Sequence, residues 1–148
     1  LAKATQIKAA FEIGRRLSTQ TVPYKSKELT DPEKVYRLIK SKLKDYTREH
    51  FYIIVLNSRN YSIAEVSVGS LNASVVHPRE VFAEAIKNKA ASVIFVHNHP
   101  SGDPEPSEGD LLTTKRLVEA GKILEIEVVD HIIVTSNSFL SFKERKLL

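Results

Sequence analysis

The strongest constraint on this chain comes from residues 92–110, where an apolar run gives way to two histidines and a turn. Residues 92–96, Ser-Val-Ile-Phe-Val, are β-branched and aromatic, which predicts a strand leading into His97 and His99. Alternate residues of a strand project from the same face, so we expect these two imidazoles to point one way and Asn98 the other. Proline or glycine fills four of the next seven positions, so the strand cannot continue and the chain must turn.

The turn leads back to a carboxylate. Asp110 lies at the start of a helix predicted over residues 107–120, where it can join the two imidazoles around one ion. Two histidines and one carboxylate suit zinc, and three protein ligands leave a fourth tetrahedral position open, as in catalytic zinc sites. Water at such a position has a pKa of about 7. The spacing therefore predicts a Zn²⁺ site of His97, His99 and Asp110, with Asp103, deep in the turn, as a weaker choice of ligand.

Ser107 and Asp110 also have a purely structural interpretation. A serine at a helix N-cap with an acid three residues later forms a capping box, and the apolar spacing after Asp110 continues the helix. The two interpretations are compatible, because a capped helix start is a rigid place from which to aim a carboxylate.

The spacing His-x-His-x7-Ser-x2-Asp resembles the motif of the JAMM metalloproteases, whose domain is also called MPN or JAB. Residues 97–110 resemble the RadC branch in particular, and residues 65–82 and 130–134 are similar to RadC-type sequence as well. The resemblance covers roughly residues 28–148, and residues 2–17 look like the tail of that family's N-terminal helical region.

The resemblance implies an α/β fold with a mixed, largely antiparallel sheet flanked by helices, the MPN/JAB and cytidine-deaminase-like architecture. It implies a metal-dependent hydrolase domain over residues 23–148 and a helix-hairpin-helix-like tail over residues 1–22. The expected activity is zinc-dependent hydrolysis of a peptide or isopeptide bond in an unidentified protein substrate. The alternative is a DNA-associated repair or processing protein whose metal site is not used for proteolysis.

The family also implies a glutamate that works as general acid and base. Two candidates fit: Glu49 precedes the apolar strand predicted over residues 50–57, and Glu65 lies in the next strand, residues 61–68. We prefer Glu49, because the family's acid enters the first strand of the domain. Ser107 resembles the hydroxyl that stabilises an oxyanion or orients the water, with the N-cap as its structural alternative.

Three other histidines are isolated in the sequence. A histidine of this kind is more often at the surface or in support of a site than a ligand, and we expect this of His50, His77 and His131. His77 is followed by Pro78, which is typical of a helix start. That helix is predicted over residues 78–90, another begins at residues 30–32, and strands are predicted at about residues 125–135 and 138–142.

Charge and composition bound the possible partners. Residues 1–48 hold 12 Lys and Arg against 5 Asp and Glu, while the whole chain has a net charge of +4. The basic N-terminal part could contact DNA phosphates, although such a helix is more often a solvated face. The absence of cysteine fits a reducing cytoplasm, and no apolar stretch approaches the roughly 20 residues of a membrane span. The chain starts at Leu1 and lacks methionine, so we expect it to be part of a longer protein.

Overall fold

The computed structural model describes residues 3, 5–8, 11–12, 29, 31–40, 42–43, 47–70 and 76–148. The described residues between 3 and 12 are helical, with Ile7 and Phe11 exposed. The boundary expected between residues 22 and 23 lies outside the described residues. The elements that follow are α2 (Pro32–Lys40), β1 (His50–Leu56), β2 (Ser62–Ser70), α3 (Pro78–Lys87), β3 (Ser92–Asn98), α4 (Glu108–Leu124), β4 (Glu127–Val134) and β5 (Phe139–Ser141).

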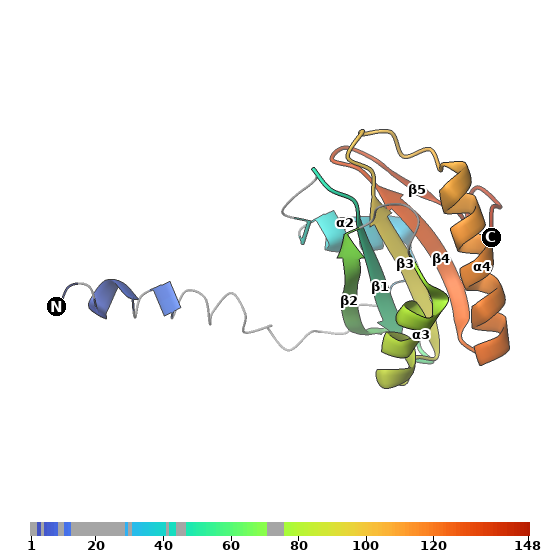
Figure 1. Ribbon diagram of the computed structural model, residues 1–148, viewed down its shortest axis with the longest axis horizontal. Coiled ribbons are helices and arrows are strands. Elements are labelled where there is room, and N and C mark those ends of the chain that lie inside the picture. The colour runs from blue at the N-terminus through green and yellow to red at the C-terminus, as the bar shows by residue number, and fades with distance from the viewer. Residues whose placement is uncertain are drawn as a thin grey trace.

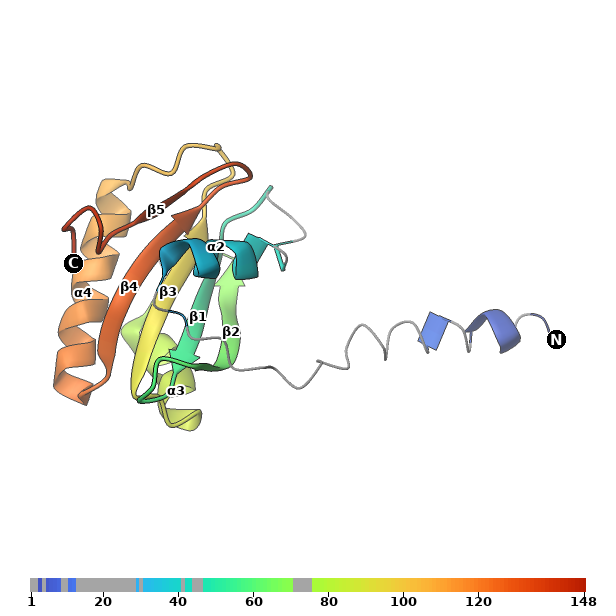
Figure 2. The same cartoon turned by 180° about the vertical axis from the view of Figure 1, so that it is seen from behind.

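The five strands form one mixed sheet in the order β2-β1-β3-β4-β5. All neighbouring pairs are antiparallel except β3 and β4, which run parallel and are joined by α4. A parallel pair needs such a crossover, because the chain must return to the same end of the sheet. Helices α3 and α4 cover one face and α2 covers the other (Figures 1 and 2). The predicted α/β fold with a largely antiparallel sheet is therefore confirmed.

The two faces of the sheet hold separate apolar cores, which follow the two-residue period of the strands. We call them the α3–α4 face and the α2 face. In β1, Phe51, Ile53 and Val55 pack on the α3–α4 face with Val81, Phe82 and Leu117 of the helices. Ile54 and Leu56 pack on the α2 face, against Val35 and Ile39 of α2. The same alternation continues in β3, where Val93 and Phe95 pack on the α3–α4 face and Ile94 and Val96 on the α2 face. Odd-numbered residues near the end of β3 therefore face α3 and α4.

Helix α4 is longer than predicted, and Gly121 lies inside it instead of ending it. The helix continues to Leu124 and ends at Glu125, which has a left-handed backbone with φ 55°. A Cβ at Gly121 would lie 2.6 Å from the carbonyl oxygen of Ile126, whose own N–H donates to the Gly121 carbonyl. The glycine is therefore required for close approach of the chain after the helix, although a glycine just after a predicted helix is typical of a stop signal.

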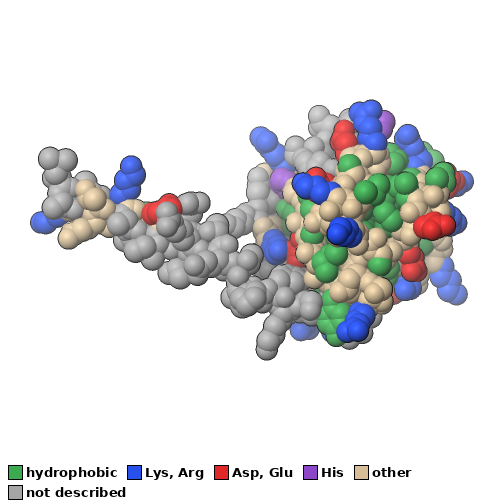
Figure 3. Space-filling view, turned by 90° about the horizontal axis from the view of Figure 1, so that it is seen from below, with side chains coloured by type: hydrophobic (Ala, Val, Ile, Leu, Met, Phe, Trp, Pro, Cys, Tyr) green, Lys and Arg blue, Asp and Glu red, His purple; other side chains and the backbone are tan. Residues whose placement is uncertain are grey.

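The outer surface contains apolar side chains that are remote from the predicted ligands. Figure 3 shows hydrophobic side chains between Lys and Arg on the face seen from below. Ile123, at the last turn of α4, is 83% exposed. It lies 13 residues after Asp110, or about 20 Å along the helix, and so takes no part in the predicted site. Within the described residues, no helix combines the length and apolar character that crossing a membrane requires.

Candidate metal centre

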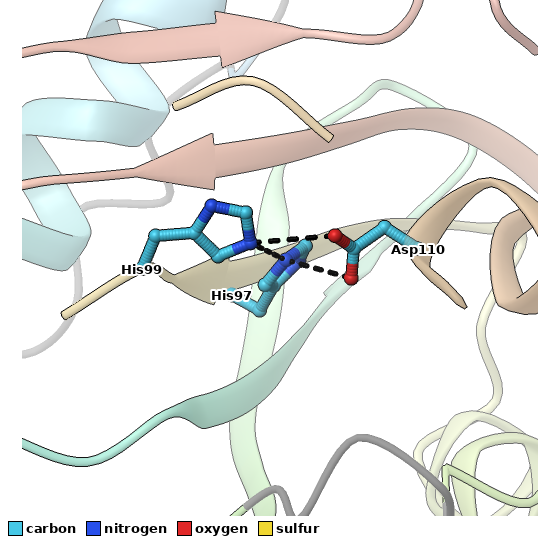
Figure 4. A group of neighbouring side chains, drawn as sticks. All are labelled: His97, His99 and Asp110. Carbon is cyan, nitrogen blue, oxygen red and sulfur yellow. Dashed lines mark hydrogen bonds and ion pairs between the residues drawn. The ribbon is translucent and has the colours of Figure 1, made fainter. Parts of the chain in front are cut away.

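The three predicted ligands converge on one point beside the end of β3 (Figure 4). The Nε2 atom of His97 lies 3.0 Å from Nε2 of His99 and 3.2 Å from Oδ1 of Asp110, and Nε2 of His99 lies 3.4 Å from Oδ2 of Asp110. Their ligand atoms all lie within 4.8 Å of one another. Two imidazole nitrogens and a carboxylate facing one point are a donor set suited to a divalent metal, so this group could bind a metal ion.

Strand geometry places both histidines on the same side. Residue His97 is opposite Phe51 of β1, and the backbone N–H of His99 donates to the carbonyl of Val134 at 3.0 Å. The chain thus stays bonded to β4 one residue beyond the end of β3. His97 and His99 project together from the α3–α4 face, as the period of two predicts.

Asp110 is held by the first turn of α4. The Ser107 side chain accepts from the Asp110 N–H at 3.2 Å, and the Ser107 N–H donates to Asp110 Oδ2 at 2.8 Å, so the predicted capping box is present. The Ser107 hydroxyl also donates to Oδ2, at 2.6 Å. A carboxylate at a helix N-terminus is favoured by the helix dipole as well. These contacts fix the direction of the carboxylate before any ion is bound.

The charges of the group favour a cation. Burial opposes ionisation of Asp110, but hydrogen bonds from His97 and His99 outweigh it and hold its pKa well below the usual range. The hydrogen bond to Asp110 raises the pKa of His99, against the effect of burial. The carboxylate is thus kept ionised, and in the metal-free protein a proton on His99 takes the place that a metal cation would fill.

The Nδ1 atoms of His97 and His99, which face away from the predicted metal position, have different partners. His99 Nδ1 lies 2.8 Å from the carbonyl oxygen of Asp103, which can only accept, so Nδ1 carries a proton and Nε2 is free to bind a metal. His97 Nδ1 lies 2.8 Å from Nε2 of His131. His131 is 1% exposed and also contacts Thr114 Oγ1, at 2.6 Å. It is therefore a buried neighbour of the site and does not lie at the surface, the other place expected for it from the sequence.

The two candidate glutamates lie on opposite faces of the sheet. Glu49 lines a small cavity together with His97, Asp110 and His131, and its space of about 10 Å³ is close to that of one water molecule. Glu65 lies opposite Ile54, on the α2 face, and its carboxylate pairs with Lys42. Only Glu49 is thus near the ligands. Its role in catalysis stays a prediction.

Asn98 faces away from the ligands and holds the chain on both sides of Glu49. Its side-chain Oδ1 accepts from the N–H of His50 at 2.8 Å, and its Nδ2 donates to the carbonyl of Arg48 at 2.9 Å. The side chain is completely buried. These contacts fix the backbone of Arg48 and His50, the two neighbours of Glu49 in the chain.

Comparison with known proteins agrees with the geometry. The family model described as "RadC-like JAB domain" matches residues 29–147. The chain belongs to the RadC-like JAB domain family. Relatives named UPF0758 protein include one from Desulforamulus reducens, 50% identical over 149 residues, which are 99% of this chain and 65% of the relative. Another, from Caldanaerobacter subterraneus, is 50% identical over 98% of this chain and 63% of the relative.

The similarity to a further relative also covers nearly the whole chain. The UPF0758 protein of Methanosarcina mazei is 48% identical over 97% of this chain and 63% of its own length. This chain therefore spans slightly less than two thirds of these relatives. Their shared name states no activity. The resemblance to RadC-type sequence is confirmed.

Proposed function

We propose that this RadC-like JAB domain is a zinc-dependent hydrolase that cleaves a peptide or isopeptide bond. The observation that carries the proposal is the convergence of His97 Nε2, His99 Nε2 and the Asp110 carboxylate beside the cavity that Glu49 lines. Three protein ligands with an open position are the arrangement of catalytic zinc, whereas structural zinc is closed by four. When bound, the ion would polarise the carbonyl and lower the pKa of water.

The chain's own residues would supply proton transfer and orientation. Glu49 takes the proton of the attacking water and gives it to the leaving amine nitrogen, which is the work of a general base and then a general acid. The Ser107 N–H would keep holding the ligand Asp110 at 2.8 Å, while the single Ser107 O–H proton, which donates to Asp110 Oδ2 at 2.6 Å in the absence of substrate, would turn to the carbonyl oxygen of the substrate.

The test joins metal content to cleavage. Wild-type protein purified with zinc is incubated with a mixture of peptides and with a lysine-linked isopeptide, before and after chelation and after zinc is restored. His97→Ala should lose both zinc and cleavage. His77→Ala is the matched control, because the His77 side chain makes no capping hydrogen bond and His77 lies at the start of α3.

A nucleic-acid arm separates the proposal from the DNA-associated alternative. The same preparations are incubated with single- and double-stranded DNA at several salt concentrations. Cleavage of the isopeptide or peptides that chelation stops supports a zinc peptidase. Salt-dependent DNA binding with no cleavage of peptide by zinc-loaded protein contradicts it and supports the alternative.

A further inference from the structure

His131 is a polar side chain in an apolar, aromatic environment, and both of its ring nitrogens make hydrogen-bond contacts. Its ring is enclosed by aromatic side chains: Phe142 stacks on it at 4.7 Å between centroids, and Phe51 and Phe95 meet it edge-on at 5.7 and 6.0 Å. An apolar residue would fill this space without desolvating polar atoms. Instead the imidazole lies between His97 and Thr114, with both of its nitrogens in hydrogen-bond contact.

The protons of this chain of contacts can be assigned from its far end. Thr114 Oγ1 lies 2.6 Å from the backbone carbonyl of Asp110, and a carbonyl can only accept, so the single hydroxyl proton points there. His131 Nδ1, 2.6 Å from the same Oγ1, must then be the donor. A neutral His131 with its proton on Nδ1 has a bare Nε2, which accepts from Nδ1 of His97.

This assignment of protons determines the tautomer of the predicted ligand His97. If Nδ1 of His97 carries a proton, its Nε2 has a free lone pair directed at His99 and Asp110. Had His131 carried a proton on Nε2, His97 would accept on Nδ1 and present an N–H to the metal position. A metal-ligating histidine has its other nitrogen fixed in this way in most sites, usually by a carboxylate or a backbone carbonyl. Here a second histidine does it.

We propose that His131 and Thr114 are positioning residues that hold His97 in the tautomer able to bind metal. The inference rests on the metal-binding part of the proposed function. The relay runs from the Asp110 carbonyl through Thr114 and His131 to His97, so two ligands on different elements, α4 and β3, are connected through β4. His99 has no side chain in the equivalent place, since the Asp103 carbonyl holds it.

The first experiment measures zinc affinity by competition with a chromophoric chelator. His131→Leu removes the acceptor and should weaken zinc binding by about 10- to 100-fold, as the loss of a supporting residue typically does. His131→Gln, whose amide oxygen can still accept from His97, should lose less. Thr114→Val should weaken binding, while Thr114→Ser, which keeps the hydroxyl, should stay close to wild type.

Ser141→Ala is the matched control for Thr114→Val. It also removes a buried hydroxyl, one that donates to Asp130 Oδ2 at 2.6 Å, but outside the relay. This variant should bind zinc like wild type. Wild-type affinity in both His131→Leu and Thr114→Val would overturn the proposal.

The second experiment reads the tautomer directly and does not depend on any variant folding. Long-range ¹⁵N–¹H correlation spectra of the zinc-loaded full chain should show His131 neutral with its proton on Nδ1, and His97 protonated on Nδ1 and ligated through Nε2. A proton on His131 Nε2 would overturn the proposal. If wild-type protein binds no zinc, the proposed function fails, yet the metal-free spectrum still tests the His131 tautomer.

Discussion

The two faces of the sheet have similar apolar cores but differ where β1 begins and β3 ends. On the α3–α4 face, the core of Phe51 and Phe95 gives way to His97 and His131. On the α2 face, Val96 and Val134 continue the apolar core to the same end of the sheet. The difference follows from register alone. A slip of one residue in β3 would exchange the faces of its histidine and its valine and remove the site.

The same contrast separates two glutamates that look alike in the sequence. Glu65 is buried in β2 on the α2 face, where Lys42 neutralises its charge. Among the described side chains, its Oε1 is a buried polar atom without a hydrogen-bond partner. Glu49, just before β1, lines the cavity with the ligands. A carboxylate that already has a cationic partner is poorly suited to moving protons, so the faces differ in chemistry as well as in polarity.

The largest effect should come from removing a ligand on the α3–α4 face. His97→Ala, His99→Ala and Asp110→Ala should each weaken zinc binding by more than the roughly 10- to 100-fold typical of losing a supporting residue, because only three protein ligands are available. Zinc content after dialysis measures the effect. Val96→Ala, on the α2 face of the same strand, should lower stability and keep the metal. Full zinc occupancy in Asp110→Ala would remove that residue from the ligand set.

A second comparison sets the glutamates against each other. Glu49→Gln should retain zinc and fold but lower hydrolysis by about 10²- to 10⁴-fold, the usual contribution of proton transfer by a side chain. Glu65→Gln should change the turnover little and alter mainly stability, since its partner is Lys42. Parallel measurements of kcat and zinc content decide between them. Loss of turnover in Glu65→Gln alone would make our choice of acid and base wrong.

Asn98 holds the backbone on both sides of Glu49, and its loss should have a smaller effect on turnover than the loss of Glu49. Asn98→Ala removes both hydrogen bonds that flank Glu49, so turnover should fall by up to about 10²-fold, as expected when a reacting group is misplaced by about 1 Å. Zinc should stay bound. Asn57→Ala is the matched control, because the Asn57 side chain also makes two hydrogen bonds to the backbone, accepting from the N–H groups of Arg59 and Tyr61 at the far end of β1.

The outcome for this pair tests positioning against simple stability. Both variants should destabilise the fold by about 1–3 kcal/mol if the freed backbone groups stay buried. Only Asn98→Ala should lose turnover. An equal loss of turnover in Asn57→Ala would mean that lower stability explains the effect, and Asn98 would then have no special relation to Glu49.

The ligands could be predicted from the sequence because local rules place them. Strand alternation brings His97 and His99 to one side, and a capping box fixes Asp110 relative to Ser107. Both rules act over a few residues, and the turn between them is too rich in proline to adopt many paths. The sheet type could be predicted as well, since the apolar runs and helices alternate in a pattern similar to RadC-type sequence.

The contacts of the supporting residues could not be predicted, because these residues meet through pairing between distant strands. His131 reaches His97 only because β4 lies parallel to β3 with Phe95 opposite His131. Asn98 finds Arg48 and His50 through the antiparallel pairing of β3 with β1. The role of Gly121 was also missed, since a glycine near a helix end is typical of a cap and only the close contact with Ile126 distinguishes the two roles.

The smallest expected effect is on the pH dependence of stability of the metal-free protein. The pKa of His99 is raised by its hydrogen bond to Asp110, so its contribution to stability is fully present below the ordinary histidine pKa and is lost as pH rises through the folded-state value. Burial lowers the pKa of His131 well below that range, so the unfolded state gains a proton first and stability falls as pH drops below about 6.5. The two pKa shifts together favour a maximum in the stability of the metal-free protein near pH 6.5.

Thermal unfolding with a chelator at pH 5.5, 6.5 and 8.5 measures the loss of stability on both sides of the maximum, which we call the acid arm and the alkaline arm. Asp110→Asn should flatten the alkaline arm by removing the anion that raises the pKa of His99, and His131→Gln should flatten the acid arm. The changes should amount to a few degrees at most, since about 1 kcal/mol moves the Tm of a domain of this size by roughly 4 °C. Zinc should abolish the alkaline arm in wild-type protein, because metal binding excludes the His99 proton. An unchanged alkaline slope in Asp110→Asn would show that another group, on either face of the sheet, is responsible.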